Sequence, residues 1–297
     1  MVRRLLVPVA GLLAVGMVAA GLFVGCNSSS SVSFTLGVAH RDLTYCNSQT
    51  LDLYIPRVDA KRPLPLAIYV HGGGMTSGDK SNLNPVFLDA LASAGYAVAS
   101  VNYRLAPEFK FPVQIEDVKC AIRYLRDKAP VYGVNASEIF AFGTSVGGQL
   151  AALAALTGPH SPFDVGPFRT ESSSVLAIAD MFGPANLTEG GGFTPSDDQQ
   201  VFGTTHRDLV LASPTHYVGA NSPPILIVQG VLDTKVVESQ AIELYSDLRA
   251  AGDHTQLVLV QNMGHMFAQV GPKQLDPSLR KIAQVMVSFF SRCLDRK

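Results

Sequence analysis

The sequence predicts an α/β domain in which a mostly parallel sheet is covered by helices on both faces. Three observations support this prediction. Apolar runs of four to seven residues recur, stretches of helical period separate them, and 18 prolines and 26 glycines are spread along the chain. A bundle of long helices disfavours both of these residues. The 47% hydrophobic residues and the net charge of −1 exclude a disordered chain.

Seven apolar runs are expected to form strands. The run at 51–55 alternates and ends at Pro56, which is typical of an exposed antiparallel strand. The run at 66–70 is apolar almost throughout, as expected of a strand that is buried on both faces of a parallel sheet. The other five strands are expected at 97–101, 139–142, 175–179, 225–228 and 257–260.

Five helices are expected around these strands, at 84–94, 112–128, 146–156, 236–250 and 279–294. Strand–helix alternation after an antiparallel entry favours a mostly parallel sheet within one domain, which we place at 36–297. The irregular segments 157–174 and 181–224 interrupt the alternation. Loops this long are often functional, and 181–224 follows a strand end, so we expect it to supply a small lid.

The first 25 residues have the layout of an export signal peptide. Two arginines precede an uncharged apolar run at 5–24, and Cys26 follows a glycine. This end resembles the signal of a bacterial lipoprotein, which implies lipidation of Cys26, membrane anchoring and a Ser-rich tether at 26–35. Two alternatives are a secretory cleavage after Ala20 and an uncleaved membrane-spanning anchor. All three place the domain outside the cytoplasm.

An exported chain is able to form a disulfide, because the compartments outside the cytoplasm are oxidising. If Cys26 is lipidated, then Cys46, Cys120 and Cys293 remain, so that at most one disulfide forms. The sequence does not select the pair, and buried thiols are the alternative.

The strongest catalytic motif is G-T-S-V-G-G at 143–148. It follows the expected strand 139–142 and precedes an Ala- and Leu-rich helix, which is the setting of a nucleophile elbow. The flanking glycines permit a sharp turn, and a helix N-terminus favours a developing oxyanion. Ser145 is therefore the candidate nucleophile. The alternative is a glycine-rich turn with a capping serine.

Further motifs supply groups that could act together with a serine nucleophile. H-G-G-G at 71–74 follows a strand and leaves backbone N–H groups unshielded, which suits an oxyanion hole. Asp233 and His265 each follow an expected strand, and the chain order Ser, Asp, His fits the elbow. Because parallel strands end at one edge of the sheet, these side chains are expected to converge. The competing residues are Asp180 for the acid, and His206, His216 and His254 for the base.

Together these motifs resemble those of the α/β-hydrolases, in the esterase/lipase group near hormone-sensitive-lipase-like and acetyl xylan or feruloyl esterase-like enzymes. The matching stretches are 71–74, 77–80, 102–107, 111–125, 143–148, 230–236 and 264–265. The resemblance covers about residues 36–295 and implies an eight-stranded, mostly parallel sheet. It also implies the site: Ser145 as nucleophile, Asp233 as acid, His265 as base, and oxyanion donors from Gly73, Gly74 and Val146.

The resemblance implies a serine carboxylesterase that acts through an acyl-enzyme on short-chain, aryl or sugar esters, either small or linked to a polysaccharide. Val146 stands where the family usually has Ala, and a helical cap before the first strand is missing, so small acyl groups are favoured. No cofactor or metal is expected, because HExxH, CxxC and paired His/Asp ligand spacings are absent from the sequence. The near-zero net charge disfavours a nucleic-acid partner.

Two alternative functions remain open on this sequence. The same scaffold supports an amidase, an arylformamidase or a peptidase, which the ratio of ester to amide hydrolysis would separate. A non-catalytic surface binding protein is the other alternative, and the intact Ser145, Asp233 and His265 argue against it.

Overall fold

Eight strands form one sheet in the computed structural model, which describes residues 36–58, 62–190, 192, 200–203 and 205–295. The strands are β1 (Leu36–Thr44), β2 (Thr50–Pro56), β3 (Leu64–Val70), β4 (Ala97–Val101), β5 (Val134–Thr144), β6 (Ile178–Met181), β7 (Ile225–Gly230) and β8 (Thr255–Val260). Their order across the sheet is β1-β2-β4-β3-β5-β6-β7-β8. Only β1–β2 and β2–β4 pair antiparallel among these strands, which confirms the predicted mostly parallel sheet.

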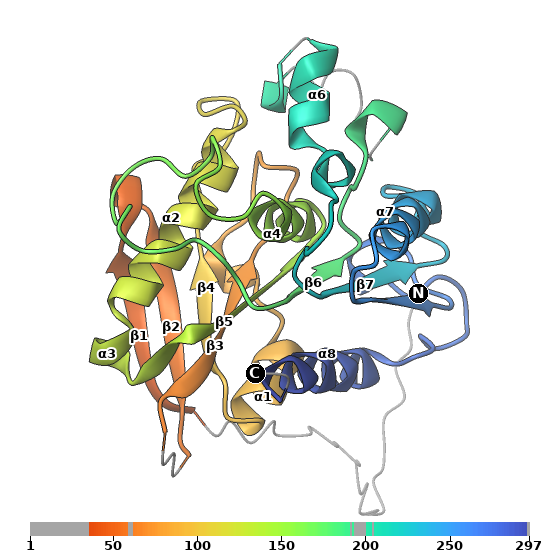
Figure 1. The fold of residues 1–297 in the computed structure, drawn as a ribbon. Coiled ribbons are helices and arrows are strands. Elements are labelled where there is room, and N and C mark those ends of the chain that lie inside the picture. The colour runs from red at the N-terminus through yellow and green to blue at the C-terminus, as the bar shows by residue number, and fades with distance from the viewer. Residues whose placement is uncertain (1–35, 59–61, 191, 193–199, 204, 296–297) are drawn as a thin grey trace, which may run out of the picture. The chain divides into compact units, whose positions relative to one another are not determined.

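Helices cover both faces of this sheet (Figure 1). One face carries α1 (Pro85–Ser93) and α8 (Leu279–Leu294), and the other carries α2 (Val113–Asp127), α3 (Ala129–Tyr132), α4 (Val146–Leu156) and α7 (Glu238–Ala250). The short α6 (His206–Ala212) belongs to the long connection between β6 and β7. The five predicted helices are confirmed, each with bounds within two residues of those expected.

The core has one apolar layer on each side of the sheet, and β3 shows why its sequence is almost wholly apolar. Leu66, Ile68 and Val70 point into the layer that contains α2 and α4. Ala67 and Tyr69 alternate with them and point into the layer that contains α1 and α8. Since side chains alternate along a strand and both faces are covered, every residue of β3 is buried.

The prediction that 51–55 forms an exposed strand is wrong, although its antiparallel pairing is correct. β2 lies inside the sheet between β1 and β4. Leu51 and Leu53 are fully buried, and Tyr54 is buried in the opposite layer. β1 takes the exposed edge position instead, and its polar, weakly periodic sequence explains why the apolar runs did not include it.

The strand expected at 175–179 begins and ends later than predicted. β6 spans Ile178–Met181, because its register pairs Ile178 with Ala141 of β5 and with Ile225 of β7. Just before β6, Leu176 N still donates to the Ile139 carbonyl of β5. Further upstream, Arg126 donates to the backbone carbonyls of Ser172 and Ser174. Asp180 therefore lies inside a strand and not in the loop after it.

One disulfide joins two of the three cysteines that the sequence left unassigned. Cys46 is bonded to Cys120 of α2, with their Cα atoms 6.2 Å apart. Cys293 lies outside this bond, buried in α8. The bridge ties the β1–β2 connection to the helix layer, across a sequence separation of 74 residues.

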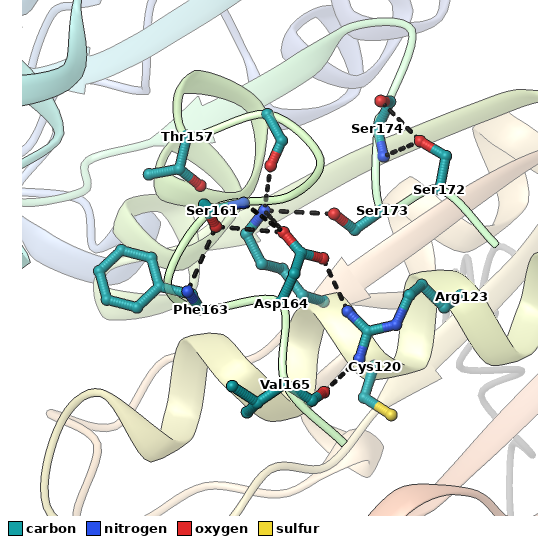
Figure 2. A network of polar contacts seen from close by, with 12 residues as sticks. Cys120, Arg123, Thr157, Ser161, Phe163, Asp164, Val165, Ser172, Ser173 and Ser174 are labelled. Atoms are coloured by element: carbon teal, nitrogen blue, oxygen red, sulfur yellow. Dashed lines mark hydrogen bonds and ion pairs between the residues drawn. The ribbon is translucent and has the colours of Figure 1, made fainter. Parts of the chain in front are cut away.

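The irregular segment 157–174 is packed onto α2 by a buried polar network (Figure 2). Lys119 Nζ contacts Asp164 Oδ2 at 3.0 Å and also donates to the Gly158 carbonyl and to Ser173 Oγ. Arg123 contacts the other oxygen, Asp164 Oδ1, at 2.7 Å. This long loop is therefore fixed in place by ion pairs, and it does not supply residues to the cavity described below.

The predicted signal peptide 1–25, the lipidation site Cys26 and the tether 26–35 lie outside the described residues. Within the described ranges, no helix combines the length and apolar character needed to cross a bilayer.

Candidate active site

Ser145 occupies a tight turn between β5 and α4. Its backbone, at φ 55 and ψ −128, has the strained conformation that lifts a nucleophile above a sheet. A Cβ on Gly143 would lie 2.2 Å from the Gly147 backbone, and one on Gly147 would lie 2.1 Å from the Val70 carbonyl oxygen. The glycines of the motif are thus required for close packing of the turn against α4 and β3.

His265 links Ser145 to Asp233. The imidazole Nε2 lies 2.9 Å from Ser145 Oγ, and Nδ1 lies 2.7 Å from Asp233 Oδ2. The three residues come from the ends of β5, β7 and β8, as expected from the parallel sheet. The side chains of Ser145, His265 and Asp233 therefore form one continuous hydrogen-bonded chain.

Asp233 is held by its own loop. Its Oδ1 accepts hydrogen bonds from the backbone N–H groups of Lys235 at 2.8 Å and Val236 at 3.0 Å. Its side chain is fully buried, whereas the His265 side chain is 21% exposed. This arrangement leaves Oδ2 for the imidazole and fixes the direction from which it approaches.

The competing residues lie elsewhere. Asp180 is buried in β6, where its Oδ1 accepts from the Gly183 N–H at 2.9 Å. Burial raises the pKa of Asp180 to about 7. The three competing bases are all exposed on other segments: His206, His216 and His254.

The loop after β3 presents backbone N–H groups beside Ser145. Gly73 and Gly74 have φ of +114 and +64, the left-handed region that favours glycine. Val146 is the first residue of α4. Within the described ranges, the N–H groups of these three residues donate no hydrogen bond.

Contacts between His71 and Tyr103 support this loop. Its ring stacks on Tyr103 with centroids 4.2 Å apart, and the Tyr103 hydroxyl donates to the His71 carbonyl at 2.9 Å. Burial lowers the pKa of the His71 imidazole, which favours its neutral form. The His of the H-G-G-G motif is therefore part of the scaffold and lies outside the hydrogen-bonded chain.

A cavity of about 360 Å³ opens over Ser145 and His265. The expected residues Gly73, Gly74 and Val146 line it. The lining also includes six residues that were not predicted as site residues: Thr76, Pro184, Gly192, Lys235, Val236 and Met266. Four of them are close in sequence to a predicted site residue, and Pro184 and Gly192 belong to segment 181–224. This proximity in the sequence is the signal that could have identified them. Pro184 and Gly192 show that this segment contributes to the wall of the cavity.

In the described part of the chain, no group of three or more His, Cys, Asp or Glu side chains is arranged to hold a metal ion. The cavity is lined by the hydroxyl-bearing Ser145 and Thr76, the His265 imidazole, Lys235, glycines and apolar side chains. Such a set of groups suits nucleophilic attack on a carbonyl carbon and stabilisation of the resulting oxyanion.

Known esterases are similar in sequence to this chain. Esterase LipC of Mycobacterium tuberculosis is 28% identical over 80% of this chain and 61% of its own length. Ethyl acetate hydrolase of Pseudomonas putida is 27% identical over 69% of this chain and 66% of its own length. The chain thus spans about three-fifths to two-thirds of these relatives.

Solved structures share the fold. A truncated carbohydrate esterase from gut microbiota superposes with a TM-score of 0.75 at 24% identity, and the match covers 88% of this chain and 98% of that one. The profile of the BD-FAE family matches residues 51–248, which include Ser145 and Asp233. The chain therefore has the α/β-hydrolase fold and belongs to the BD-FAE family.

Proposed function

We propose that this protein is a serine carboxylesterase with Ser145 as nucleophile, His265 as general base and Asp233 as the acid of the triad. The observation that carries the proposal is the hydrogen-bonded chain from Ser145 Oγ through both imidazole nitrogens to Asp233 Oδ2. The esterases among its relatives support it. A strained serine at a helix N-terminus, next to a cavity, is the arrangement that acyl transfer requires.

The proposed reaction has two steps. His265 Nε2 takes the proton of Ser145 Oγ as this oxygen attacks the ester carbonyl, and then gives it to the departing alcohol. The acyl group remains on Ser145 until water, deprotonated by the same imidazole, attacks it; the carboxylic acid leaves and the imidazole returns the proton to Ser145 Oγ. Asp233 keeps the Nδ1 proton in place and stabilises the imidazolium in both steps.

The oxyanion of each tetrahedral intermediate would be stabilised by the N–H groups of Gly73, Gly74 and Val146. These groups border the cavity, and the described residues offer them no other acceptor. Each such donor is typically worth about 10²–10³ in rate, so the loop after β3 is a major contributor to the proposed catalysis.

The acyl group is proposed to be short. Val146 lines the cavity directly after Ser145, and its branched side chain is 2% exposed. The volume of about 360 Å³ must hold both the acyl and the alcohol parts. The alcohol is proposed to be an aryl group or a sugar. The ethyl acetate hydrolase among the similar proteins supports a small acyl group, and the carbohydrate esterase supports a sugar as the alcohol.

We also propose that the protein is exported, with residues 1–25 removed, Cys26 lipidated, 26–35 as a tether and segment 181–224 as a small lid. The Cys46–Cys120 disulfide supports export, because such bonds persist in oxidising compartments. Mass spectrometry of the mature N-terminus tests the proposal. A diacylated Cys26 would establish the lipoprotein, whereas an unmodified terminus after Ala20 would indicate secretion.

Hydrolysis of p-nitrophenyl acetate, butyrate and octanoate tests the proposed activity. We expect the acetate and the butyrate to be cleaved. Where deacylation is slower than acylation, we expect an initial burst of p-nitrophenol equal to the enzyme concentration. The Ser145→Ala variant should lose at least about 10⁴ in kcat. Matched anilides run in parallel would reveal an amidase. A folded wild-type protein inactive on every substrate would contradict the proposal.

A further inference from the structure

Phe182 follows β6 and lies against the proposed general base. Its ring is edge-on to the His265 imidazole, with the two centroids 5.1 Å apart and an interplanar angle of 67°. The Phe182 residue is 1% exposed and does not line the cavity over Ser145. It therefore contacts the imidazole from within the protein, on a side that substrate does not reach.

The backbone of Phe182 is held in an unusual conformation. Its φ of 49 lies in the left-handed region, which a bulky aromatic residue rarely adopts. Two hydrogen bonds fix the turn: Phe182 N donates to the Val228 carbonyl at 2.7 Å, and Gly183 N donates to Asp180 Oδ1 at 2.9 Å. Backbone conformations of this kind persist only where the surrounding structure enforces them, and they concentrate at functional sites.

Asp180 also touches the nucleophile turn. A Cβ on Gly148, in the first turn of α4, would lie 2.1 Å from Asp180 Oδ1. β6 pairs with β5 next to it, Asp180 opposite Gly143. One buried carboxyl group thus contacts both α4, which begins directly after Ser145, and the turn that carries Phe182.

We propose that Phe182 is a positioning residue that keeps the His265 imidazole in line between Ser145 and Asp233, and that Asp180 holds Phe182 in place. The inference rests on the proposed function, which makes His265 the proton carrier. Hydrogen bonds at the two ring nitrogens leave the imidazole free to tilt about the line that joins them. The Phe182 ring blocks this tilt, and the ring of Phe267, with its centroid 4.8 Å from that of Phe182, packs against it.

We expect loss of the Phe182 contact to lower the turnover rate and to leave substrate binding unchanged. A tilted imidazole transfers the proton of Ser145 less efficiently, and small misplacements of reacting groups are costly in rate. Because Phe182 does not line the cavity, the affinity for substrate should not depend on it. Loss of the contact should therefore lower kcat and leave KM unchanged.

A matched pair of substitutions tests this. Phe87 of α1 is also 1% exposed and contacts the same Phe267, at 5.4 Å, but its other ring partner among the described residues is Phe142. Phe182→Leu and Phe87→Leu thus remove similar volumes from the same layer. We expect Phe182→Leu to lose about tenfold in kcat, with KM within about twofold, and Phe87→Leu to keep kcat within about twofold.

Variants of Asp180 extend the test to the second half of the proposal. Asp180→Ala removes the acceptor of the Gly183 N–H and should lower kcat as Phe182→Leu does. Asp180→Asn keeps an oxygen at this position and should restore kcat relative to Asp180→Ala. Equal kcat losses in Phe182→Leu and Phe87→Leu, or a change carried by KM, would overturn the positioning role.

The NMR resonance of the His265 Nδ1 proton provides a readout that does not depend on turnover. We expect this resonance to shift and broaden in Phe182→Leu and to stay unchanged in Phe87→Leu. An unchanged resonance in Phe182→Leu would overturn the inference. Failure of the proposed function is distinguishable, because it would appear as absent hydrolysis by the wild-type protein whatever the resonance shows.

Discussion

The cluster of Ser145, His265 and Asp233 and the network of Lys119, Arg123 and Asp164 each place polar side chains around one carboxylate. In the second, Lys119 Nζ has three acceptors, and Arg123 donates to the carbonyls of Val165 and Pro167 as well as to Asp164. Its neighbouring cavity measures about 120 Å³.

The active-site cluster differs because some of its hydrogen-bond donors have no partner. It borders a cavity three times as large, Ser145 is strained, and the N–H groups of Gly73 and Gly74 have no acceptor among the described residues. The comparison teaches that a buried ion pair alone does not indicate chemistry. Strain and unpaired donors beside an open cavity do, because they remain available to a substrate.

The largest expected effect is a loss of kcat that distinguishes Asp233 from Asp164. Asp233→Asn removes the charge that orients and stabilises His265, so kcat should fall by about 10⁴ while the free energy of unfolding changes little. Steady-state hydrolysis of p-nitrophenyl acetate and urea denaturation provide the two measurements. Retention of more than about a tenth of kcat would remove Asp233 from the proposed triad.

Asp164→Asn should show the opposite pattern. It leaves Lys119 and Arg123 buried beside a neutral amide, and breaking such a pair typically costs about 3–5 kcal/mol of the free energy of unfolding. kcat, measured well below the melting temperature, should stay within about twofold of wild type because the network lies outside the cavity. A large loss of kcat in a folded variant would mean that the two clusters are coupled.

The Cys46–Cys120 bond anchors α2, the helix that carries the network. Reduction, or Cys46→Ala with Cys120→Ala, should lower the free energy of unfolding by about 2–4 kcal/mol, because a loop of 74 residues is released in the unfolded chain. Urea titrations with and without reductant measure the change. An equal loss of stability in the Cys293→Ala variant would contradict a specific role for this bond.

Asp180 should make stability depend on pH. Burial raises its pKa to about 7, so the folded protein binds this proton more tightly than the unfolded chain does. Its contribution is complete below about pH 4 and is lost as the pH rises to about 7, on the order of 1–4 kcal/mol. Urea titrations from pH 4 to 8 should show the wild type losing stability relative to Asp180→Asn. Parallel pH profiles would contradict the shifted pKa.

The smallest expected effect concerns the active-site cavity itself. Val146→Ala removes two methyl groups beside Ser145, so kcat/KM for butyrate should rise a few-fold, roughly 2–10, relative to acetate. The chain-length series of p-nitrophenyl esters measures this ratio. An unchanged chain-length profile would place the acyl group elsewhere in the cavity.

Much of the sheet and the candidate site could be predicted because the signals are local. The apolar run at 66–70, the glycines around Ser145 and the strand ends before Asp233 and His265 each express a physical requirement of their own segment. Parallel topology then implies convergence of the three side chains, and their atoms do lie 2.7–2.9 Å apart.

Other features depend on partners that are distant in the chain. The burial of β2 follows from coverage by β1, and the register of β6 follows from pairing with β5 and β7. The disulfide partner of Cys46 lies 74 residues away, and the sequence left three pairings open.

The sequence by itself determined the α/β fold class, the nucleophile elbow and the order of Ser145, Asp233 and His265, because periodicity and turn chemistry act within a few residues. Only the tertiary structure decided that Asp180 belongs to β6, that Lys119 and Arg123 hold the loop 157–174, and that Phe182 lies against His265. Contacts of this kind join segments from different strands, and no local pattern in either segment records which partner the fold will bring to it.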